Sequence, residues 1–227
     1  MQSTRLHTAS GLNLARPATE VMGFYRSRIL PQILDLSERM PGVEAARQRA
    51  VEYAGGHVLE IGSGLGSTLM YYSGEITSLT TVDPNPALNA RARRRLRHVP
   101  FPVDVREGRG ENLPVKDAAF DCVVSTFTLC CVDNLDRVAA EIYRVLKPGG
   151  RFHFVEIGLS EDPSEARWQR RLSRLQRVFV DGCRLDMALG AALTGAGLAV
   201  KRLEMTRLER LPRPMGCAWE GLAVREA

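Results

Sequence analysis

Short apolar runs alternate along most of the chain with segments whose apolar residues recur at helical spacing. The runs predict strands near 57–61, 77–82, 101–105, 119–125, 150–157, 197–206 and 216–224. The helical spacing predicts helices near 66–73, 86–97, 135–146, 163–180 and 186–195. Residues 20–53 also have a helical pattern, with breaks at Pro31 and Pro41–Gly42. The alternation predicts an α/β fold with a single doubly wound, mostly parallel, seven-stranded sheet.

Capping residues support these boundaries. Asp83-Pro84-Asn85-Pro86 follows the second predicted strand and suits the start of a helix. Asp133-Asn134 precedes the amphipathic segment LDRVAAEIYRVL. Lys147-Pro148-Gly149-Gly150 ends that helix and turns into the fifth strand. We expect residues 1–55 to form an N-terminal helical segment, and 56–227 to form the core, with no linker dividing it.

The sequence VLEIGSGLG at 58–66 has the pattern of a buried strand that turns into a ligand-binding loop. Val58, Leu59 and Ile61 suit a strand that is buried on both faces. The glycines at alternate positions from 62 to 66 let a ligand approach the backbone closely. Asp83 closes the next strand about 20 residues further on, where a carboxylate can bind both hydroxyls of a ribose. The pattern predicts a nucleotide-like ligand, although Asp83 also suits a helix N-cap.

Composition narrows the classes of partner. The 227 residues carry a net charge of +5, and the arginine-rich stretches at 91–97 and 167–177 read as solvated helix faces. We therefore expect no nucleic-acid partner. No apolar run is long enough to cross a membrane, and the N-terminus lacks a secretory h-region. Five cysteines without CxxC spacing are typical of free thiols in a reducing cytosol, so we expect a cytoplasmic protein with no metal.

Four segments together resemble the class I S-adenosylmethionine-dependent methyltransferases: VLEIGSGLG (58–66), VDPNP (82–86), GRGENLPVKDAAFDCVVSTFTLCCV (108–132) and EIYRVLKPGGRFHFVE (141–156). They follow the order of that family over about 100 residues, and ENLP and RVLKPGG are far more specific than the glycines. The resemblance implies a Rossmann-like methyltransferase fold. It also implies S-adenosylmethionine as cofactor, with S-adenosylhomocysteine as product.

The resemblance also implies which residues bind the cofactor, from four strand ends: Glu60, Gly62, Ser63, Gly64, Asp83, Pro84, Asn85, Gly110, Glu111, Asn112, Ser125 and Thr126. The glycine loop would pass under the methionyl group, with Glu60 orienting the loop. Asp83 would hold the ribose, and Ser125 and Thr126 would lie near the methionyl amino group, although packing is an equal reading for Thr126. Relatives have an aspartate where this chain has Arg109, which puts the usual carboxylate to the adenine amine in doubt.

A narrower resemblance covers YRSRILPQILDL near the N-terminus, and DPSEARWQRRL and DGCRLD after the fifth predicted strand. These segments are similar to bacterial relatives of the alkyl-thiol methyltransferases, the methyltransferase-like seven group. The chain lacks the apolar membrane anchor of that group. It also has Ile157 where many relatives have a histidine, which removes one candidate base. The resemblance favours a small-molecule thiol as the methyl acceptor.

A thiol acceptor needs no strong base, because its pKa near 8.5 leaves part of it ionised at neutral pH. Glu156, at the end of the fifth predicted strand, is the best candidate for a catalytic base, and a hydrogen-bonding partner within the sheet is an equal reading. Phe24, Tyr25, Cys130 and Cys183 are candidates for the acceptor pocket. The cysteines also suit small buried apolar side chains.

Phe24 and Tyr25, together with Trp168, could form a lid that excludes water, or they could be ordinary core aromatics. Two further functions stay open at this point. One is transfer of the methyl group to oxygen, nitrogen or carbon of a metabolite. The other is cofactor binding without turnover, which the arginine at position 109 allows.

Overall fold

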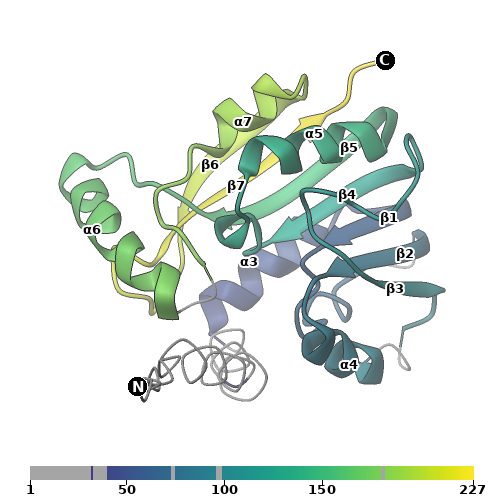
Figure 1. Ribbon diagram of the computed structural model, residues 1–227, viewed down its shortest axis with the longest axis horizontal. Coiled ribbons are helices and arrows are strands. Elements are labelled where there is room, and N and C mark those ends of the chain that lie inside the picture. The colour runs from purple at the N-terminus through teal and green to yellow at the C-terminus, as the bar shows by residue number, and fades with distance from the viewer. Residues whose placement is uncertain (1–31, 33–39, 73–74, 96–98, 180–181) are drawn as a thin grey trace, which may run out of the picture.

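The computed structural model describes residues 32, 40–72, 75–95, 99–179 and 182–227. Within them, helices and strands alternate along the chain (Figure 1). The strands are β1 (Gly56–Ile61), β2 (Ile76–Asp83), β3 (Val103–Glu107), β4 (Phe120–Thr126), β5 (Leu146–Ile157), β6 (Ala199–Arg207) and β7 (Cys217–Val224). The helices are α3 (Pro41–Val51), α4 (Pro86–Arg95), α5 (Leu135–Val145), α6 (Pro163–Phe179) and α7 (Leu189–Gly195), with a short 3-10 turn, η3 (Leu129–Cys131).

The described strands form one seven-stranded sheet in the order β3-β2-β1-β4-β5-β7-β6. β1 pairs in parallel with β2 on one side and with β4 on the other. β7 runs antiparallel to both of its neighbours, β5 and β6. The predicted doubly wound, mostly parallel sheet is therefore confirmed, and β1 and β4 lie at the point where the strand order reverses.

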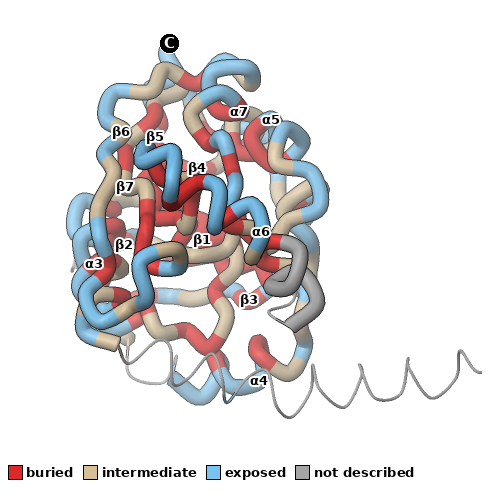
Figure 2. The backbone as a smooth tube through the Cα atoms, turned by 90° about the vertical axis from the view of Figure 1, so that its left-hand side faces the viewer, coloured by how far each residue is buried: buried red, intermediate tan, exposed pale blue. Residues whose placement is uncertain are grey.

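Helices cover both faces of the sheet. In Figure 1, α5 and α7 lie above the strands, and α3 and α4 lie below them. Figure 2 shows the buried backbone concentrated in the strands between these layers. The largest buried cluster joins the sheet to α5 and α7, and it includes Val138 and Ile142 of α5 with Leu193 of α7. The apolar face predicted for 135–146 is thus the face that packs on the sheet.

The helix predicted at 66–73 is wrong. Residues 64–71 form successive turns, in which the Gly66 amide donates to the Ser63 carbonyl at 2.7 Å and the Tyr71 amide donates to the Thr68 carbonyl at 2.9 Å. Gly66 has a φ of +73°, a left-handed conformation that a right-handed helix cannot include. Apolar spacing predicted a helix here, but the segment forms turns closed by bonds to the third residue back, beginning at the left-handed Gly66.

The remaining elements predicted after residue 56 are present, with shifted ends. β5 begins at Leu146 rather than at residue 150, because Leu146 already pairs with Phe120 before an irregularity leads to the pairing of Cys122 with Arg151. Both predicted caps are present. The Asn85 side chain accepts from the Ala87 amide at 3.0 Å, and the Asn134 side chain accepts from the Arg137 amide at 3.0 Å.

Several expectations concern residues outside the described part of the chain. They include Phe24 and Tyr25, the lid and most of the segment 1–55, of which α3 is described. Trp168, the other lid candidate, lies on α6 with 57% of its surface exposed. Among the described helices none combines the length and the apolar character that a membrane crossing requires.

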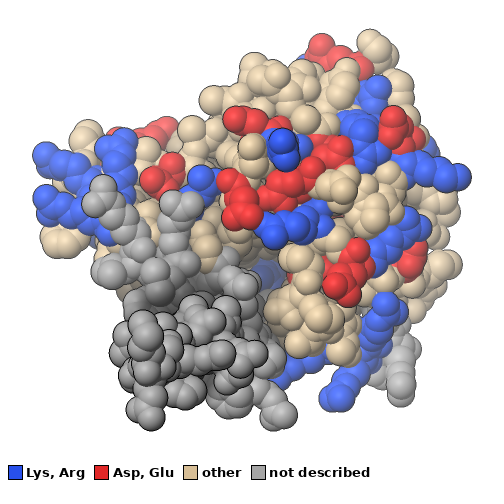
Figure 3. All heavy atoms as spheres, viewed as in Figure 1, with Lys and Arg blue, Asp and Glu red and all other residues tan. Residues whose placement is uncertain are grey.

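Charged side chains of both signs share the face shown in Figure 3. Lys and Arg gather at its left edge, over α6, where Arg167, Arg170 and Arg171 are exposed. Over the rest of this face, acidic and basic groups interleave. This mixed face has the character of a solvated surface rather than of a continuous basic groove.

Replacing Asn134 tests the cap of α5. In Asn134→Ala the Arg137 amide loses its side-chain acceptor, so the free energy of unfolding should fall by about 1 kcal/mol in a urea titration. Asn134→Ser is the matched control and should retain most of the stability, because serine also caps helices. Equal stability of all three proteins would contradict this role.

Candidate functional site

The polar groups singled out in the sequence meet at one edge of the sheet. Four buried residues stand at the carboxyl ends of β1, β2, β4 and β5: Glu60, Asp83, Thr126 and Glu156. We call these four residues the strand-end group. Parallel strands bring these ends together at the same edge. Because β1 lies between β2 and β4, the glycine loop that follows β1 occupies the centre of the group.

The Asp83 carboxylate fastens this loop to the neighbouring strand. Its Oδ2 accepts from the Gly64 amide at 3.0 Å, and its Oδ1 accepts from the Asn85 amide at 2.8 Å. The Asn89 side chain donates to the Asp83 carbonyl at 3.0 Å. Asn85, rather than Asp83, caps α4. The side chain of Asp83 is therefore directed at the glycine loop, and each carboxylate oxygen can accept more than one hydrogen bond.

The glycine loop needs its glycines for close approach. Gly62 has a φ of +71°, and a Cβ atom on it would overlap the Thr128 side chain. The Thr128 hydroxyl donates to the Gly62 carbonyl at 3.2 Å, which ties the loop to the segment after β4. Thr128 was missed by the sequence reasoning, since no motif signals a contact between residues so far apart in the chain.

Two further side chains define the interior of the loop. The Thr68 hydroxyl donates to the Glu60 carboxylate, so a hydrogen bond joins the end of β1 to the far side of the loop. The Ser63 hydroxyl is buried and has no hydrogen-bond partner among the described residues. A buried polar atom of this kind calls for a polar partner, and a ligand of the loop can supply one.

Glu156 is fully buried and accepts hydrogen bonds from two elements. Its Oε1 accepts from the Ser125 hydroxyl at 2.6 Å, and its Oε2 accepts from the Leu129 amide at 2.9 Å. Burial raises the pKa of Glu156 to about 7, although these hydrogen bonds oppose the rise. The carboxylate thus joins β4, β5 and η3. The Ser125 hydroxyl is likewise directed at Glu156.

The segment after β3 is held by the start of α5. Glu111 accepts from the Asp133 amide at 2.8 Å, and Arg109 forms an ion pair with Asp133. Burial alone would raise the pKa of Glu111, but backbone hydrogen bonds, including those from Asn134 and Asp133, and the charge of Arg109 lower it. Arg109 therefore pairs with an acid of the protein. The bond from the Asn112 amide to the Arg109 carbonyl, at 3.1 Å, closes this turn.

Phe127 carries backbone strain beside the site. Its φ of +54° is left-handed, which costs roughly 1–2 kcal/mol for a residue with a Cβ atom. Its amide donates to the Val155 carbonyl at 2.8 Å, and the Arg47 guanidinium lies 5.5 Å from the centre of its ring. Strain of this kind is typical of segments that position functional groups.

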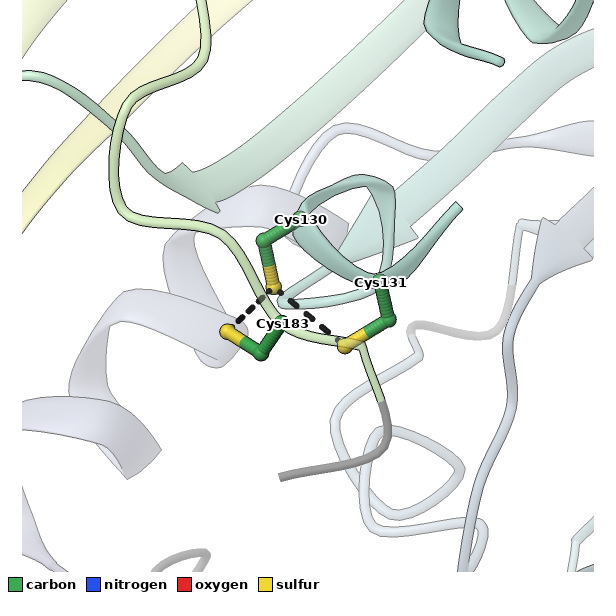
Figure 4. Close-up of side chains that lie close together, drawn as sticks. All are labelled: Cys130, Cys131 and Cys183. Carbon is green, nitrogen blue, oxygen red and sulfur yellow. Dashed lines mark hydrogen bonds between the residues drawn. The ribbon is translucent and has the colours of Figure 1, made fainter. Parts of the chain in front are cut away.

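Cys130 and Cys183, the predicted pocket cysteines, lie against each other. Their sulfur atoms are 3.2 Å apart, and both side chains belong to the large buried cluster under α5 and α7. Cys131 joins them, with its sulfur 3.6 Å from that of Cys130 (Figure 4). Hydrogen bonding with the thiols of Cys130 and Cys131, together with the charge of Arg184, lowers the pKa of Cys183.

Two hollows have different surroundings. A polar hollow of about 430 Å³ beside Glu75, Asp121 and Lys147 lies at the opposite edge of the sheet, where β1 and β5 begin, so it is remote from the strand-end group. A mainly apolar cavity of about 300 Å³ lies beyond β5, lined in part by Leu159, Met187, Leu189, Leu203 and Trp219. Trp219 pairs with Glu156 in the sheet, which places this cavity beside the strand-end group.

Known proteins resemble this chain in sequence. Residues 59–154 match a family model described as a methyltransferase domain. Human thiol S-methyltransferase TMT1A is 34% identical over 152 residues, which are 65% of this chain and 62% of that protein. The phosphatidylethanolamine N-methyltransferase of Cereibacter sphaeroides is 30% identical over 151 residues, which are 64% of this chain and 73% of that protein.

Solved structures agree on the fold. A chain from the complex of the Haloferax volcanii Trm112 activator with a methyltransferase has a TM-score of 0.69 at 19% identity, and the match covers 89% of this chain and 96% of that one. An S-adenosylmethionine-dependent methyltransferase of Thermotoga maritima has a TM-score of 0.61 at 22% identity, and the match covers 93% of this chain and 97% of that one.

The chain belongs to the class I S-adenosylmethionine-dependent methyltransferases, whose cofactor is S-adenosylmethionine. This confirms the resemblance and the cofactor predicted from the sequence. The chain spans 62% and 54% of the lengths of the two thiol S-methyltransferases that it matches, TMT1A of human and TMT1B of rat.

The raised pKa of Glu156 predicts a pH-dependent stability. Between its ordinary pKa of 4.5 and the folded value of about 7, the folded chain keeps a proton that the unfolded chain has released. The contribution of Glu156 is therefore full below pH 4.5 and is lost as the pH rises to 7. The free energy of unfolding of wild type, minus that of Glu156→Gln, should fall by at most about 3 kcal/mol across this range.

Two checks isolate Glu156 in these denaturant titrations. Burial lowers the pKa of His153 to about 4, which acts in the opposite direction, but the histidine is present in both proteins and cancels in the difference. Glu165→Gln is the matched control: Arg207 lowers the pKa of Glu165, so its difference should stay flat above pH 4.5. A flat difference for Glu156→Gln would refute the raised pKa.

Proposed function

We propose that this chain transfers a methyl group from S-adenosylmethionine to a small-molecule thiol. The observation that supports methyl transfer is the buried group of strand-end residues around the glycine loop. The thiol rests on relatives whose names describe thiol S-methyltransferases, TMT1A and TMT1B, at 34% and 35% identity. When bound, the cofactor supplies an electrophilic methyl group on a positively charged sulfur atom.

The described residues fit such a cofactor. Gly62 and Gly64 both have the left-handed φ that lets the loop turn tightly under the methionyl group, and the buried Ser63 hydroxyl gives that end a polar partner. Asp83 is our candidate for the ribose hydroxyls, because its carboxylate lies beside the Gly64 amide at the end of β2. Gly110 packs against Val138 and Ile61, so a side chain there would crowd the adenine end.

Glu156 fits the role of a residue that positions η3 better than the role of a catalytic base that takes a proton from the acceptor. It is fully buried, and both of its oxygens already accept hydrogen bonds from Ser125 and Leu129. By holding Leu129, it fixes η3 directly after the strained Phe127. A partly ionised thiol needs no base of its own, so a chain with Glu156 in this role can still methylate sulfur.

The apolar cavity beyond β5 supports an acceptor with a hydrocarbon portion. Its described lining includes aliphatic residues and Trp219, and its volume of about 300 Å³ suits a small molecule. Trp219 is fixed there by a hydrogen bond of 2.9 Å to the Leu159 carbonyl. The acceptor would lie with its apolar part here and its sulfur toward the end of β5.

Transfer to carbon or nitrogen is the second candidate. A ubiquinone/menaquinone C-methyltransferase of Rubrivivax gelatinosus is 34% identical over 108 residues, and the N-methyltransferase of Cereibacter sphaeroides also matches. Carbon and nitrogen acceptors more often require a proton acceptor at the reacting atom. The pH dependence of turnover therefore separates these reactions from S-methylation.

A panel of acceptors tests the proposed reaction. Hydrophobic thiols, phenols and amines of similar shape are incubated with the protein and S-adenosylmethionine, and S-adenosylhomocysteine is quantified. We expect the highest kcat/KM for a thiol, rising with pH up to the pKa of that thiol as the thiolate fraction grows. Methylation of phenols or amines but not of thiols would refute the thiol, and cofactor binding without any product would refute turnover.

Asp83 tests the cofactor site separately from the acceptor. In Asp83→Asn the charged hydrogen bonds to a ribose are weakened, and such bonds are worth about 1.5–3 kcal/mol. The affinity for S-adenosylhomocysteine in calorimetry should fall roughly 10- to 100-fold. Asp104→Asn, an exposed acid of the adjacent strand that pairs with Arg106, is the matched control and should bind normally. Unchanged affinity in the folded Asp83 variant would refute this assignment.

A further inference from the structure

Three thiols converge on one point beside the strand-end group. The sulfur atoms of Cys130, Cys131 and Cys183 all lie within 4.8 Å of one another. Figure 4 shows the sulfur atoms of Cys131 and Cys183 on either side of that of Cys130; Cys130 and Cys131 belong to η3, and Cys183 belongs to the loop before α7. The other two cysteines, Cys122 and Cys217, are buried elsewhere in the sheet.

The two segments are held together independently of the thiols. The Arg184 amide donates to the Cys130 carbonyl at 2.7 Å, and the Leu185 amide donates to the Ser173 hydroxyl of α6 at 2.9 Å. Gly182 has a φ of +88°, and a Cβ atom there would lie 3.5 Å from the Cys131 carbonyl oxygen. The bond from Arg184 to Cys130 therefore holds the two cysteine-bearing segments side by side before any ligand is present.

We propose that Cys130, Cys131 and Cys183 bind one soft divalent metal ion of the zinc class. A Zn–S bond of about 2.3 Å in tetrahedral geometry requires sulfur atoms about 3.8 Å apart. The separations from Cys130 are 3.2 Å to Cys183 and 3.6 Å to Cys131, and all three sulfur atoms lie within 4.8 Å of one another, so shifts of no more than about 1 Å would bring each pair to that value. Three thiolates with an open fourth position form a donor set that selects soft ions.

The charge of the site suits this ligand. Three thiolates and a divalent ion leave one net negative charge, in a region where burial makes charge costly. Arg184 supplies a neighbouring positive charge, and its Nε is buried without a hydrogen-bond partner among the described residues. Each thiol that binds as a thiolate gives its proton to solvent, so binding weakens as the pH falls.

The number of thiols distinguishes a metal from a disulfide. A disulfide joins two sulfur atoms at about 2.05 Å and would leave the third thiol unused beside it. An ion uses all three. The ion would also hold η3 in place. Because the Leu129 amide of η3 donates to Glu156 at 2.9 Å, the ion would restrict motion next to the strand-end group.

The test uses the full chain, reduced and stripped of metal, and needs no methyl acceptor. Titration with Cd²⁺ should give a thiolate-to-metal charge-transfer band that saturates at one ion per chain, and Cd²⁺ should displace Zn²⁺ from protein loaded with Zn²⁺, because thiolates prefer the softer ion. Zn²⁺ should also raise the Tm, because an ion that binds only the folded chain stabilises it.

Variants locate the site. Cys130→Ser, Cys131→Ser and Cys183→Ser should each lower the Cd²⁺ affinity at least tenfold, since losing even an outer partner of a metal ligand costs about 10–100-fold. Cys122→Ser and Cys217→Ser are matched buried controls and should bind normally. Binding that ignores the three cluster variants, or a stoichiometry well below one, would overturn the proposal.

Two further readouts keep the test decisive. Where a cluster variant does not fold by circular dichroism, alkylation of wild type decides: Zn²⁺ should slow modification of Cys130, Cys131 and Cys183, but not of Cys122 and Cys217. A Cys130–Cys183 disulfide found by mass spectrometry in protein kept under reducing conditions would also refute the metal.

Discussion

The position of β1 between two parallel neighbours is the constraint on which the site depends. β2 on one side and β4 on the other deliver their carboxyl ends to the same edge, and the connections leave them in opposite directions. The glycine loop after β1 lies between the ends of β2 and β4 and must come close to both strands. Gly62 lies against Thr128 after β4, and Gly64 reaches Asp83 at the end of β2. A Cβ atom at Gly62 would overlap Thr128, and Gly64 has a left-handed φ of +51°, which favours glycine.

A second constraint is the cost of burying charge at this edge. Glu60, Asp83 and Glu156 are all nearly inaccessible to solvent, and each receives hydrogen bonds that offset desolvation. The bonds to Glu156 come from Ser125 and from the backbone of η3. Because the buried carboxylate requires these bonds, it also fixes where η3 begins. The balance is incomplete, because burial still holds the pKa of Glu156 at about 7.

The three cysteines lie next to the same strand ends. η3 donates an amide to Glu156 and carries two of the three thiols, while the loop before α7 brings the third. In the sequence, more than fifty residues separate Cys131 from Cys183, so no spacing rule connects them, and the expectation of a chain without a metal rested on that spacing. The proposed ion follows from tertiary contacts alone.

The sequence by itself determined the sheet, most helices and the family, because apolar periodicity, Asn134 as a cap and the segments around VLEIGSGLG are local signals. The sequence-based prediction failed at 66–73, where turns that begin at the left-handed Gly66 replace the helix that the apolar spacing predicts. Only the tertiary structure decided that Arg109 pairs with Asp133, that Thr128 holds the glycine loop and that three thiols meet. These contacts join residues that are distant in the chain, and their geometry exists only once the sheet has set the strand ends side by side.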